Sequence, residues 1–161
     1  MKTQKTKTEV AMFGAGCFWG VEEAFRKLSG VISTEVGYAG GESENTTYSE
    51  VCSGNTGHAE VVKIIFDSGK ISYKKLLEIF FSIHDPTQMN RQGPDVGYQY
   101  RSVIFYFDNF QKKESQEVLK KEQKKFSRTI ATMIEKSSTY CKAEESHQKY
   151  ISKGGKAACA I

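Results

Sequence analysis

Apolar residues recur along the chain at two spacings, one typical of strands and the other of helices. Runs that alternate or are continuously apolar predict strands at residues 8–14, 31–38, 58–67, 102–107 and 129–135. Apolar positions three and four residues apart predict helices at residues 17–28, 72–81, 110–126 and 143–150. Residues 40–55 and 85–100 show neither spacing, and we expect loops there. Because a loop as long as the second is often functional, its Asp95, Tyr98 and Tyr100 are candidate site residues.

The order of these elements indicates the fold class. Two strand-helix-strand units followed by a helix and a strand are typical of an α+β protein, a two-layer sandwich with a ferredoxin-like split βαβ core. We expect a mixed sheet, extensive coil and a single catalytic domain spanning residues 1–161, long enough to bury a core without cross-links. Residues 151–161 are rich in Gly, Lys and Ala, and we expect a mobile C-terminal tail there.

Glu60 lies on a strand whose two faces differ. It alternates in register with Val62 and Ile64, whereas the opposite face carries Lys63 and Asp67. This parity predicts a carboxyl group that faces an apolar layer, with a raised pKa and a retained proton, as suits a general acid. The alternative is a strand-end glutamate paired with a lysine.

Cys17 lies where the first strand passes into the first helix, within the glycine-rich segment 14–20. The first backbone N–H groups of the helix would face its sulfur, and together with the helix dipole they favour a thiolate. The aromatic rings of Phe18 and Trp19 would form apolar walls beside this nucleophile. Two other readings stay open: a Gly-x-Gly nucleotide-binding turn, and a cysteine that is simply buried as a small apolar residue.

Composition limits which partners the protein can bind and in which compartment we expect it. The net charge of +4 is mild, and the lysines of residues 112–125 alternate with glutamates, which is typical of a solvated helix face and not of a nucleic-acid surface. Residues 1–10 hold no apolar signal-peptide core, and no later run approaches a membrane span. We therefore expect a soluble cytoplasmic protein that binds no membrane.

Four irregularly spaced cysteines favour redox or catalytic use in a reducing compartment over a disulfide framework. We expect no metal, although a metal site remains an alternative. Its possible ligands are Cys17, Cys52, Cys141, His58, His84 and His147.

Four short motifs carry a family resemblance. They are Gly-Cys-Phe-Trp-Gly at 16–20, Gly-Tyr-Ala-Gly-Gly at 37–41, Gly-His-Ala-Glu at 57–60 and Tyr-Gln-Tyr-Arg-Ser at 98–102. Together they resemble the A-type peptide methionine sulfoxide reductases, in the family's order, over residues 13–150. The resemblance implies a ferredoxin-like core surrounded by much coil, and reduction of methionine S-sulfoxide, free or in proteins, without a cofactor.

The resemblance also implies roles for individual residues. Cys17 would attack the sulfoxide sulfur, Glu60 would protonate the oxygen, and the hydroxyls of Tyr48 and Tyr100 would hold that oxygen. Tyr48 keeps the family's position, although Thr46 stands where a proline is usual.

Substrate contacts follow from the same resemblance. Phe18 and Trp19 would cradle the substrate methyl group. Asp95, His147 and Tyr150 would contact the substrate backbone, and the last two, three residues apart, would share a helix face. Ser146 stands where the family commonly has an aromatic residue.

The attack would leave a sulfenic acid on Cys17, which a second thiol clears as a disulfide. We favour Cys159 in the tail as the resolving cysteine, with Cys141 as the alternative and Cys52 as a structural residue. Thioredoxin or a similar dithiol would then reduce the disulfide. We expect a monomer.

Two other function classes remain open from the residues. A cysteine hydrolase or acyl transferase would use Cys17 with His58 or His147 as its base, and it would consume no reductant. A non-catalytic module would hold methionine or sulfoxide peptides against Phe18 and Trp19, and it would show no turnover.

Overall fold

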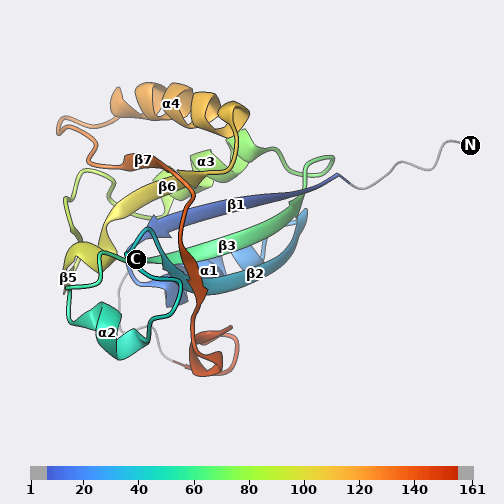
Figure 1. Cartoon of the computed structure of the whole chain (residues 1–161). Coiled ribbons are helices and arrows are strands. Elements are labelled where there is room, and N and C mark those ends of the chain that lie inside the picture. The colour runs from blue at the N-terminus through green and yellow to red at the C-terminus, as the bar shows by residue number, and fades with distance from the viewer. Residues whose placement is uncertain (1–6, 156–161) are drawn as a thin grey trace, which may run out of the picture.

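A six-stranded mixed sheet forms the centre of the computed structural model, which describes residues 7–155 (Figure 1). Its strands are β1 (Thr8–Ala15), β2 (Val31–Ala39), β3 (Ala59–Asp67), β6 (Ser102–Tyr106), β7 (Met133–Lys136) and β8 (Tyr140–Lys142). They lie side by side in the order β7-β6-β1-β3-β2-β8. The main helices are α1 (Phe18–Arg26), α3 (Tyr73–Ser82) and α4 (Asn109–Gln123).

The four central strands have the predicted ferredoxin-like arrangement. β6, β1, β3 and β2 are neighbours in that order, and each adjacent pair is antiparallel. Helix α1 connects β1 to β2 and α3 connects β3 to β6, so each connection skips one strand. In Figure 1 both helices lie behind the sheet. The predicted α+β fold class is therefore confirmed, with β7 added parallel to β6 after α4.

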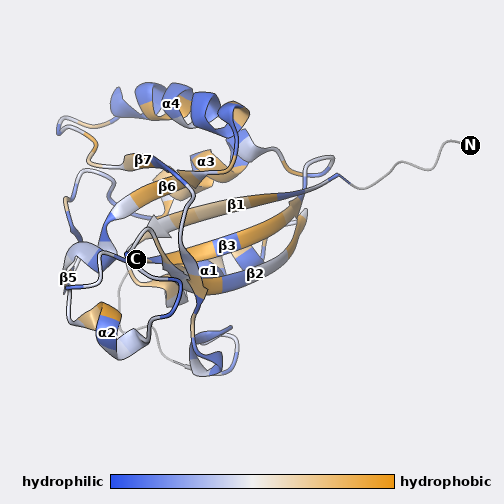
Figure 2. Cartoon of the chain, viewed as in Figure 1, coloured by the Kyte–Doolittle hydropathy of each residue, from blue (hydrophilic) through white to orange (hydrophobic). Residues whose placement is uncertain are grey.

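Aromatic side chains fill the layer between the sheet and its helices. Phe13 of β1 is fully buried, and its ring centroid lies 5.6 Å from that of Phe25 in α1 and 5.1 Å from that of Phe80 in α3. Figure 2 shows the hydrophobic colour concentrated on the central strands, whereas α4 is largely hydrophilic. This layer anchors α1, and therefore the residues at its first turn, against the sheet.

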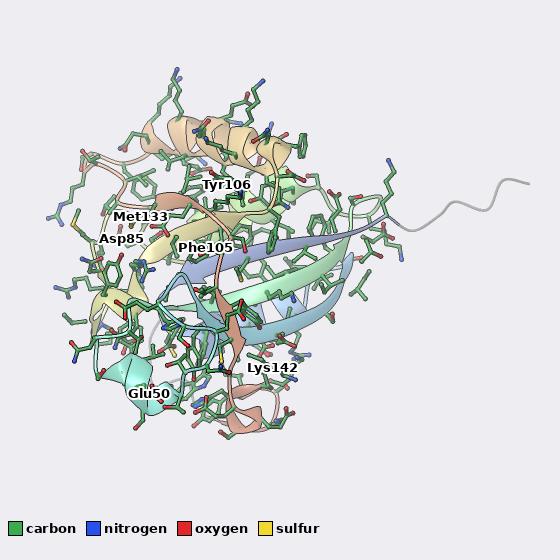
Figure 3. All side chains as sticks on the ribbon, viewed as in Figure 1. Glu50, Asp85, Phe105, Tyr106, Met133 and Lys142 are labelled. Atoms are coloured by element: carbon green, nitrogen blue, oxygen red, sulfur yellow. The ribbon has the colours of Figure 1, made fainter. Side chains whose placement is uncertain are left out.

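The chain between β7 and β8 runs from one edge of the sheet to the other, as Figure 1 shows for the orange-red segment in front of the strands. Tyr140, the first residue of β8, packs so closely on Gly37 that a Cβ at Gly37 would lie 2.5 Å from the Tyr140 ring. Only glycine fits there. Figure 3 shows Met133 at the start of this path, on β7 beside β6.

Several predicted loops and elements differ from the structure. The loop predicted at 40–55 contains α2 (Tyr48–Cys52), and the loop at 85–100 contains β4 (Arg91–Gln92), β5 (Asp95–Val96) and the 3₁₀ turn η1 (Tyr98–Tyr100). The strand predicted at 129–135 begins later, at β7, and β8 was not predicted. The helix predicted at 143–150 is only the 3₁₀ turn η2 (Glu145–His147).

Local side chains explain two of these differences. The Thr47 hydroxyl oxygen accepts the Glu50 N–H at 3.2 Å and so caps α2, a helix too short for hydrophobic periodicity to reveal. The last predicted helix fails because the Gln148 side chain bonds both the N–H and the C=O of Val36 in β2. That side chain holds the chain against the sheet edge and leaves Gln148 itself extended.

Within residues 7–155, no helix has the length and apolar character needed to cross a bilayer. The longest, α4, has 15 residues and carries lysines along its length.

We predict that Phe80→Ala lowers the free energy of unfolding by about 3 to 5 kcal/mol, because it empties a fully buried position in the layer between sheet and helices. Phe110→Ala, which truncates a ring that is 60% exposed, should change it by less than about 0.5 kcal/mol. Urea unfolding followed by circular dichroism measures both values. Equal effects of the two substitutions would contradict this description of the core.

Candidate functional site

Cys17 is the N-cap residue of α1, two residues after the end of β1. Gly16 before it has φ +94°, and a Cβ there would lie 2.7 Å from the Cβ of Gln92. Both the backbone conformation and the close neighbour require glycine. The turn therefore places Cys17 at the N-terminal end of the helix, where it is 7% exposed.

Glu60 faces the apolar layer from β3, as the strand parity predicts. It is 1% exposed, and the N–H of Phe18 donates to its Oε1 at 3.2 Å. Burial raises the pKa of Glu60 to about 8, the hydrogen bond from Phe18 opposes the shift, and the negative charge of Asp95 adds to it. Glu60 therefore holds its proton near neutral pH. It does so in contact with Phe18, the residue that follows Cys17.

The two oxygens of this carboxyl group have different surroundings. Oε1 accepts the Phe18 N–H, so it acts as the carbonyl oxygen of the neutral group. Oε2 is buried, and among residues 7–155 it has no hydrogen-bond partner. A proton on Oε2 is thus available to a bound oxygen atom.

The first backbone N–H of α1 has a partner that the sequence did not indicate. Phe18 directs it to Glu60, a residue 42 positions away in sequence. The start of α1 therefore links the residue after Cys17 to Glu60, a contact that spacing within residues 14–20 could not reveal.

Tyr48 and Tyr100 reach the same region from α2 and η1. Burial raises the pKa of both hydroxyls, and the negative charge of Glu60 raises both further. The Cys17 charge also acts on Tyr48. Both tyrosines therefore keep their O–H protons and act as hydrogen-bond donors. Each lies within electrostatic range of Glu60, as the predicted roles require.

Five rings form what we call the aromatic cluster: Phe18, Trp19, Tyr48, His147 and Tyr150. The Tyr150 ring stacks on Trp19 with centroids 4.0 Å apart and planes 13° apart. His147 lies 5.5 Å from Phe18 and 4.4 Å from Tyr48. The cluster joins α1, α2 and the chain after β8, and it forms an apolar wall at the start of α1.

His147 is neutral within this cluster. The Trp19 indole N–H donates to its Nδ1 at 3.1 Å, so Nδ1 carries no proton. Burial lowers the His147 pKa, and the negative charge of Glu144 opposes that shift. The expectation that His147 and Tyr150 share a helix face is wrong, because η2 ends at His147, but both rings contact Trp19.

Tyr38 and Glu144 support the site and were not predicted. The Tyr38 hydroxyl donates to Glu144 Oε1 at 2.9 Å, and the Tyr48 backbone N–H donates to Oε2 at 3.0 Å. Glu144 thus fixes the start of α2. The place of Tyr38 in the glycine-rich motif at 37–41 is the sequence signal that could have indicated it.

Asp95 lies on β5, whose hairpin with β4 flanks the site. Its Oδ2 is buried and has no hydrogen-bond partner within the described chain. Its charge acts on both Glu60 and Tyr100. The predicted site residue Asp95 therefore lies in electrostatic range of the acid and of one tyrosine hydroxyl.

The other cysteines are spread over different elements. Cys159 lies outside the described residues. Cys141 lies on β8 opposite Tyr38, with its thiol 3.5 Å from the Thr46 carbonyl oxygen. Cys52 lies on α2 and is exposed overall. Partial desolvation of its thiol raises its pKa, and contact with Tyr48 opposes the shift. In residues 7–155, no three His, Cys, Asp or Glu side chains come together as metal ligands.

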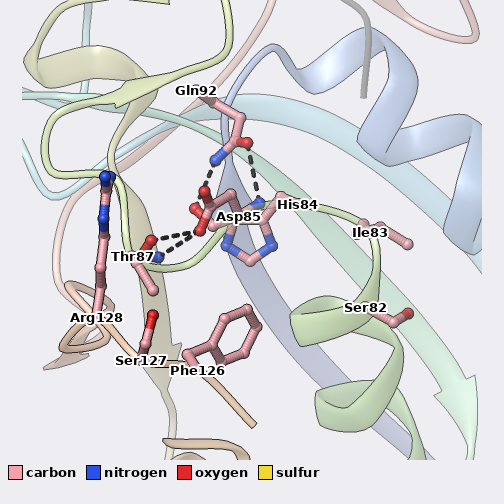
Figure 4. A pocket seen from close by; sticks show the side chains of 9 residues that line it. All are labelled: Ser82, Ile83, His84, Asp85, Thr87, Gln92, Phe126, Ser127 and Arg128. Atoms are coloured by element: carbon pink, nitrogen blue, oxygen red, sulfur yellow. Dashed lines mark hydrogen bonds between the residues drawn. The ribbon is translucent and has the colours of Figure 1, made fainter.

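A cavity of about 580 Å³ lies beside the segment that precedes Cys17 (Figure 4). The Gln92 side chain belongs to its wall, bonds the backbone of Asp85 and lies against Gly16. The remaining walls include Arg128 and Phe126. The residues expected to act on the substrate do not line this cavity, whereas His84, one of the alternative metal ligands, does.

Comparisons with known proteins agree with this geometry. The family model described as peptide methionine sulfoxide reductase matches residues 9–161. The peptide methionine sulfoxide reductase MsrA of Methanothermobacter thermautotrophicus is 54% identical over 158 residues, which cover 97% of this chain and 94% of the relative.

Solved structures of Mxr1 from Saccharomyces cerevisiae are also similar. The reduced form has a TM-score of 0.89 and 37% identity, and the match covers 95% of this chain and 89% of that one. Mxr1 in complex with Trx2 has a TM-score of 0.65 and 27% identity, covering 93% and 89%. The chain belongs to the peptide methionine sulfoxide reductase family.

Proposed function

We propose that this protein reduces methionine S-sulfoxide, free or in proteins, to methionine, with Cys17 as nucleophile and Glu60 as acid. One observation carries the proposal: a buried carboxyl group with a raised pKa and an unpartnered oxygen lies beside the N-cap cysteine. A protonated acid next to a thiol suits a reaction in which an oxygen atom must leave sulfur with a proton.

The first step moves the sulfoxide oxygen from the substrate sulfur to the Cys17 sulfur. The Cys17 thiolate attacks the sulfoxide sulfur, the proton on Glu60 Oε2 passes to the oxygen, and that oxygen ends on the Cys17 sulfur. Methionine leaves, Cys17 becomes a sulfenic acid and Glu60 becomes a carboxylate. The two electrons that reduce the sulfoxide come from the cysteine sulfur.

The surrounding side chains stabilise and orient the substrate. The protonated hydroxyls of Tyr48 and Tyr100 donate to the sulfoxide oxygen as negative charge grows on it. Phe18 and Trp19 contact the methyl group. Because the sulfoxide is chiral, a fixed arrangement of acid and aromatic wall accepts one epimer.

The substrate backbone lies against Asp95, His147 and Tyr150 in this proposal. The unpartnered Oδ2 of Asp95 is available to accept a substrate N–H. His147 uses Nδ1 for Trp19, which leaves its Nε2–H as a donor to a substrate carbonyl.

A second thiol then clears the sulfenic acid. Attack of the Cys159 thiolate on the Cys17 sulfur forms a disulfide and expels hydroxide, which takes a proton from solvent to become water. A dithiol protein reduces this disulfide and is itself oxidised to a disulfide, which regenerates both cysteines. Thioredoxin fits this role, because the related Mxr1 has been crystallised in complex with Trx2. The protein acts as a cytoplasmic monomer in this scheme.

The two rival functions have less support. A cysteine hydrolase needs a histidine base that reaches Cys17, but Nδ1 of His147 accepts the Trp19 N–H, and the His58 ring packs against Gly41 with Nε2 2.6 Å from the Ser43 carbonyl oxygen. A binding module has no use for a buried acid that keeps its proton. Both are tested by the experiments below.

We predict that single-turnover reduction of methionine sulfoxide slows as the pH rises through about 8, because Glu60 then loses the proton that it must donate. Glu60→Gln should reduce the rate by a factor on the order of 100 to 10,000 and remove this alkaline decline. Cys17→Ser should abolish the reaction. Quenched-flow chromatography of free methionine gives the rates.

Glu117→Gln on the exposed face of α4 is the matched control and should behave as the unsubstituted protein. An unchanged rate in Glu60→Gln, or an alkaline decline that persists in it, would show that Glu60 is not the acid. Release of an acyl group from an ester without loss of thiols would favour the hydrolase.

We predict that one equivalent of methionine sulfoxide converts the reduced protein to a form with a Cys17–Cys159 disulfide. Peptide mapping by mass spectrometry identifies the pair. Cys159→Ser should instead accumulate a Cys17 sulfenic acid that dimedone traps, whereas Cys141→Ser should form the same disulfide as the unsubstituted protein. A Cys17–Cys141 pair would overturn the choice of resolving cysteine.

A further inference from the structure

Glu22 is a buried carboxylate in α1, one helical turn after Trp19 and therefore on the same side of the helix. It is 2% exposed, although its neighbour Glu23 pairs with Arg26 at the surface. A carboxylate is costly to bury unless charged and hydrogen-bonding partners compensate it. Its partners therefore indicate what it does.

Both oxygens of Glu22 are used, and most of the bonds come from one distant residue. Oε1 accepts the Lys149 backbone N–H at 2.7 Å, and Oε2 accepts the Lys149 ammonium at 3.1 Å. Oε2 also accepts the Thr34 hydroxyl at 2.8 Å. The carboxylate thus fastens the backbone at Lys149 to α1 and to β2.

Lys149 lies at a strained position between two residues of the aromatic cluster. Its φ of +54° is in the left-handed region, which disfavours a residue with a Cβ. His147 two residues before it and Tyr150 directly after it both contact the Trp19 ring. The left-handed turn at Lys149 is what brings both rings to Trp19 although no helix joins them.

We propose that Glu22 is a positioning residue for substrate binding: its carboxylate holds Lys149 in the left-handed conformation and so sets His147 and Tyr150 against Trp19. This inference rests on the proposed function, in which these three side chains contact the substrate. Glu22 touches neither substrate nor Cys17 in this scheme. It therefore governs affinity for the sulfoxide and leaves the sulfur chemistry unchanged.

Trp19 is the only tryptophan in the chain, so its fluorescence reports the aromatic cluster directly and without turnover. We expect Glu22→Gln to raise the KM for methionine sulfoxide about tenfold and to change kcat less than about twofold. The acrylamide quenching of Trp19 should increase. Glu23→Gln, which removes a carboxylate from the same helix turn without contact to Lys149, is the control and should change none of these.

Two substitutions at Lys149 separate the turn from the ion pair. Both Lys149→Gly and Lys149→Val remove the ammonium and keep the backbone N–H. Glycine accepts a positive φ without cost, whereas a β-branched residue opposes it. We expect Lys149→Gly to stay within about threefold of the original KM, and Lys149→Val to reproduce the KM and quenching changes of Glu22→Gln. In both variants Glu22 keeps the Lys149 backbone N–H and the Thr34 hydroxyl as partners, so the loss of the ammonium is common to the two and only the turn distinguishes them.

The outcomes are distinct. Unchanged KM and Trp19 quenching in Glu22→Gln, or equal effects of Gly and Val at Lys149, would overturn the proposal. A fall in kcat at constant KM would also overturn it. Absence of sulfoxide reduction in the unsubstituted protein would instead refute the proposed function, and the quenching of Trp19 in the Lys149 pair would still decide the positioning role. Should Glu22→Gln not fold, the Lys149 pair gives the same decision.

Discussion

One hydrogen bond, from the Phe18 backbone N–H to the Glu60 carboxyl group, connects the two halves of the site. It fixes Glu60 of β3 at the start of α1, against the residue that follows Cys17. Glu60 is 1% exposed there. Burial favours the neutral acid, and the single N–H is too weak to reverse that preference, so the pKa stays raised at about 8. The same contact occupies Oε1 and leaves Oε2 as the oxygen that carries the proton. Cys17 and Glu60 are thus held close together through the backbone N–H of the residue between them in space, Phe18.

The fold supplies this contact through its strand order. β3 lies next to β1 in the sheet, although α1 and β2 separate them in sequence, and α1 begins where β1 ends. The apolar layer around Phe13 presses α1 against the sheet and excludes water from the Glu60 side chain. The remaining parts of the site come from less regular chain. Short turns held by Glu22, Gln148 and Glu144 carry Tyr48, His147 and Tyr150 to the start of α1. The rigid sheet therefore fixes Cys17 and Glu60, and the turns shape the surface around them.

Much of this arrangement follows from the sequence. Strand parity is enough to turn Glu60 inward, since a period of two leaves only two faces and one of them carries lysine. The glycines around Cys17 indicate a tight strand-to-helix turn, and hydrophobic spacing reveals the four central strands. The features that spacing missed depend on contacts between distant residues. Lys149 adopts a left-handed conformation because Glu22, 127 positions earlier, binds it, and Tyr48 is fixed by Glu144, 96 positions later. No window of neighbouring residues contains such information. The cap of α2 is different, since Thr47 and Glu50 form a recognisable capping pair.

The central claim is that the buried Glu60 carboxyl group keeps its proton at neutral pH beside Cys17. Carbon-13 NMR of the reduced protein, labelled at the glutamate side-chain carboxyl carbons, measures this directly, with the Glu60→Gln protein identifying the signal. The account predicts that the Glu60 signal is that of a neutral acid at about pH 7 and changes to a carboxylate with a midpoint near 8. A Glu60 signal already ionised at about pH 7, with its midpoint near the ordinary value of 4.5, would contradict the account.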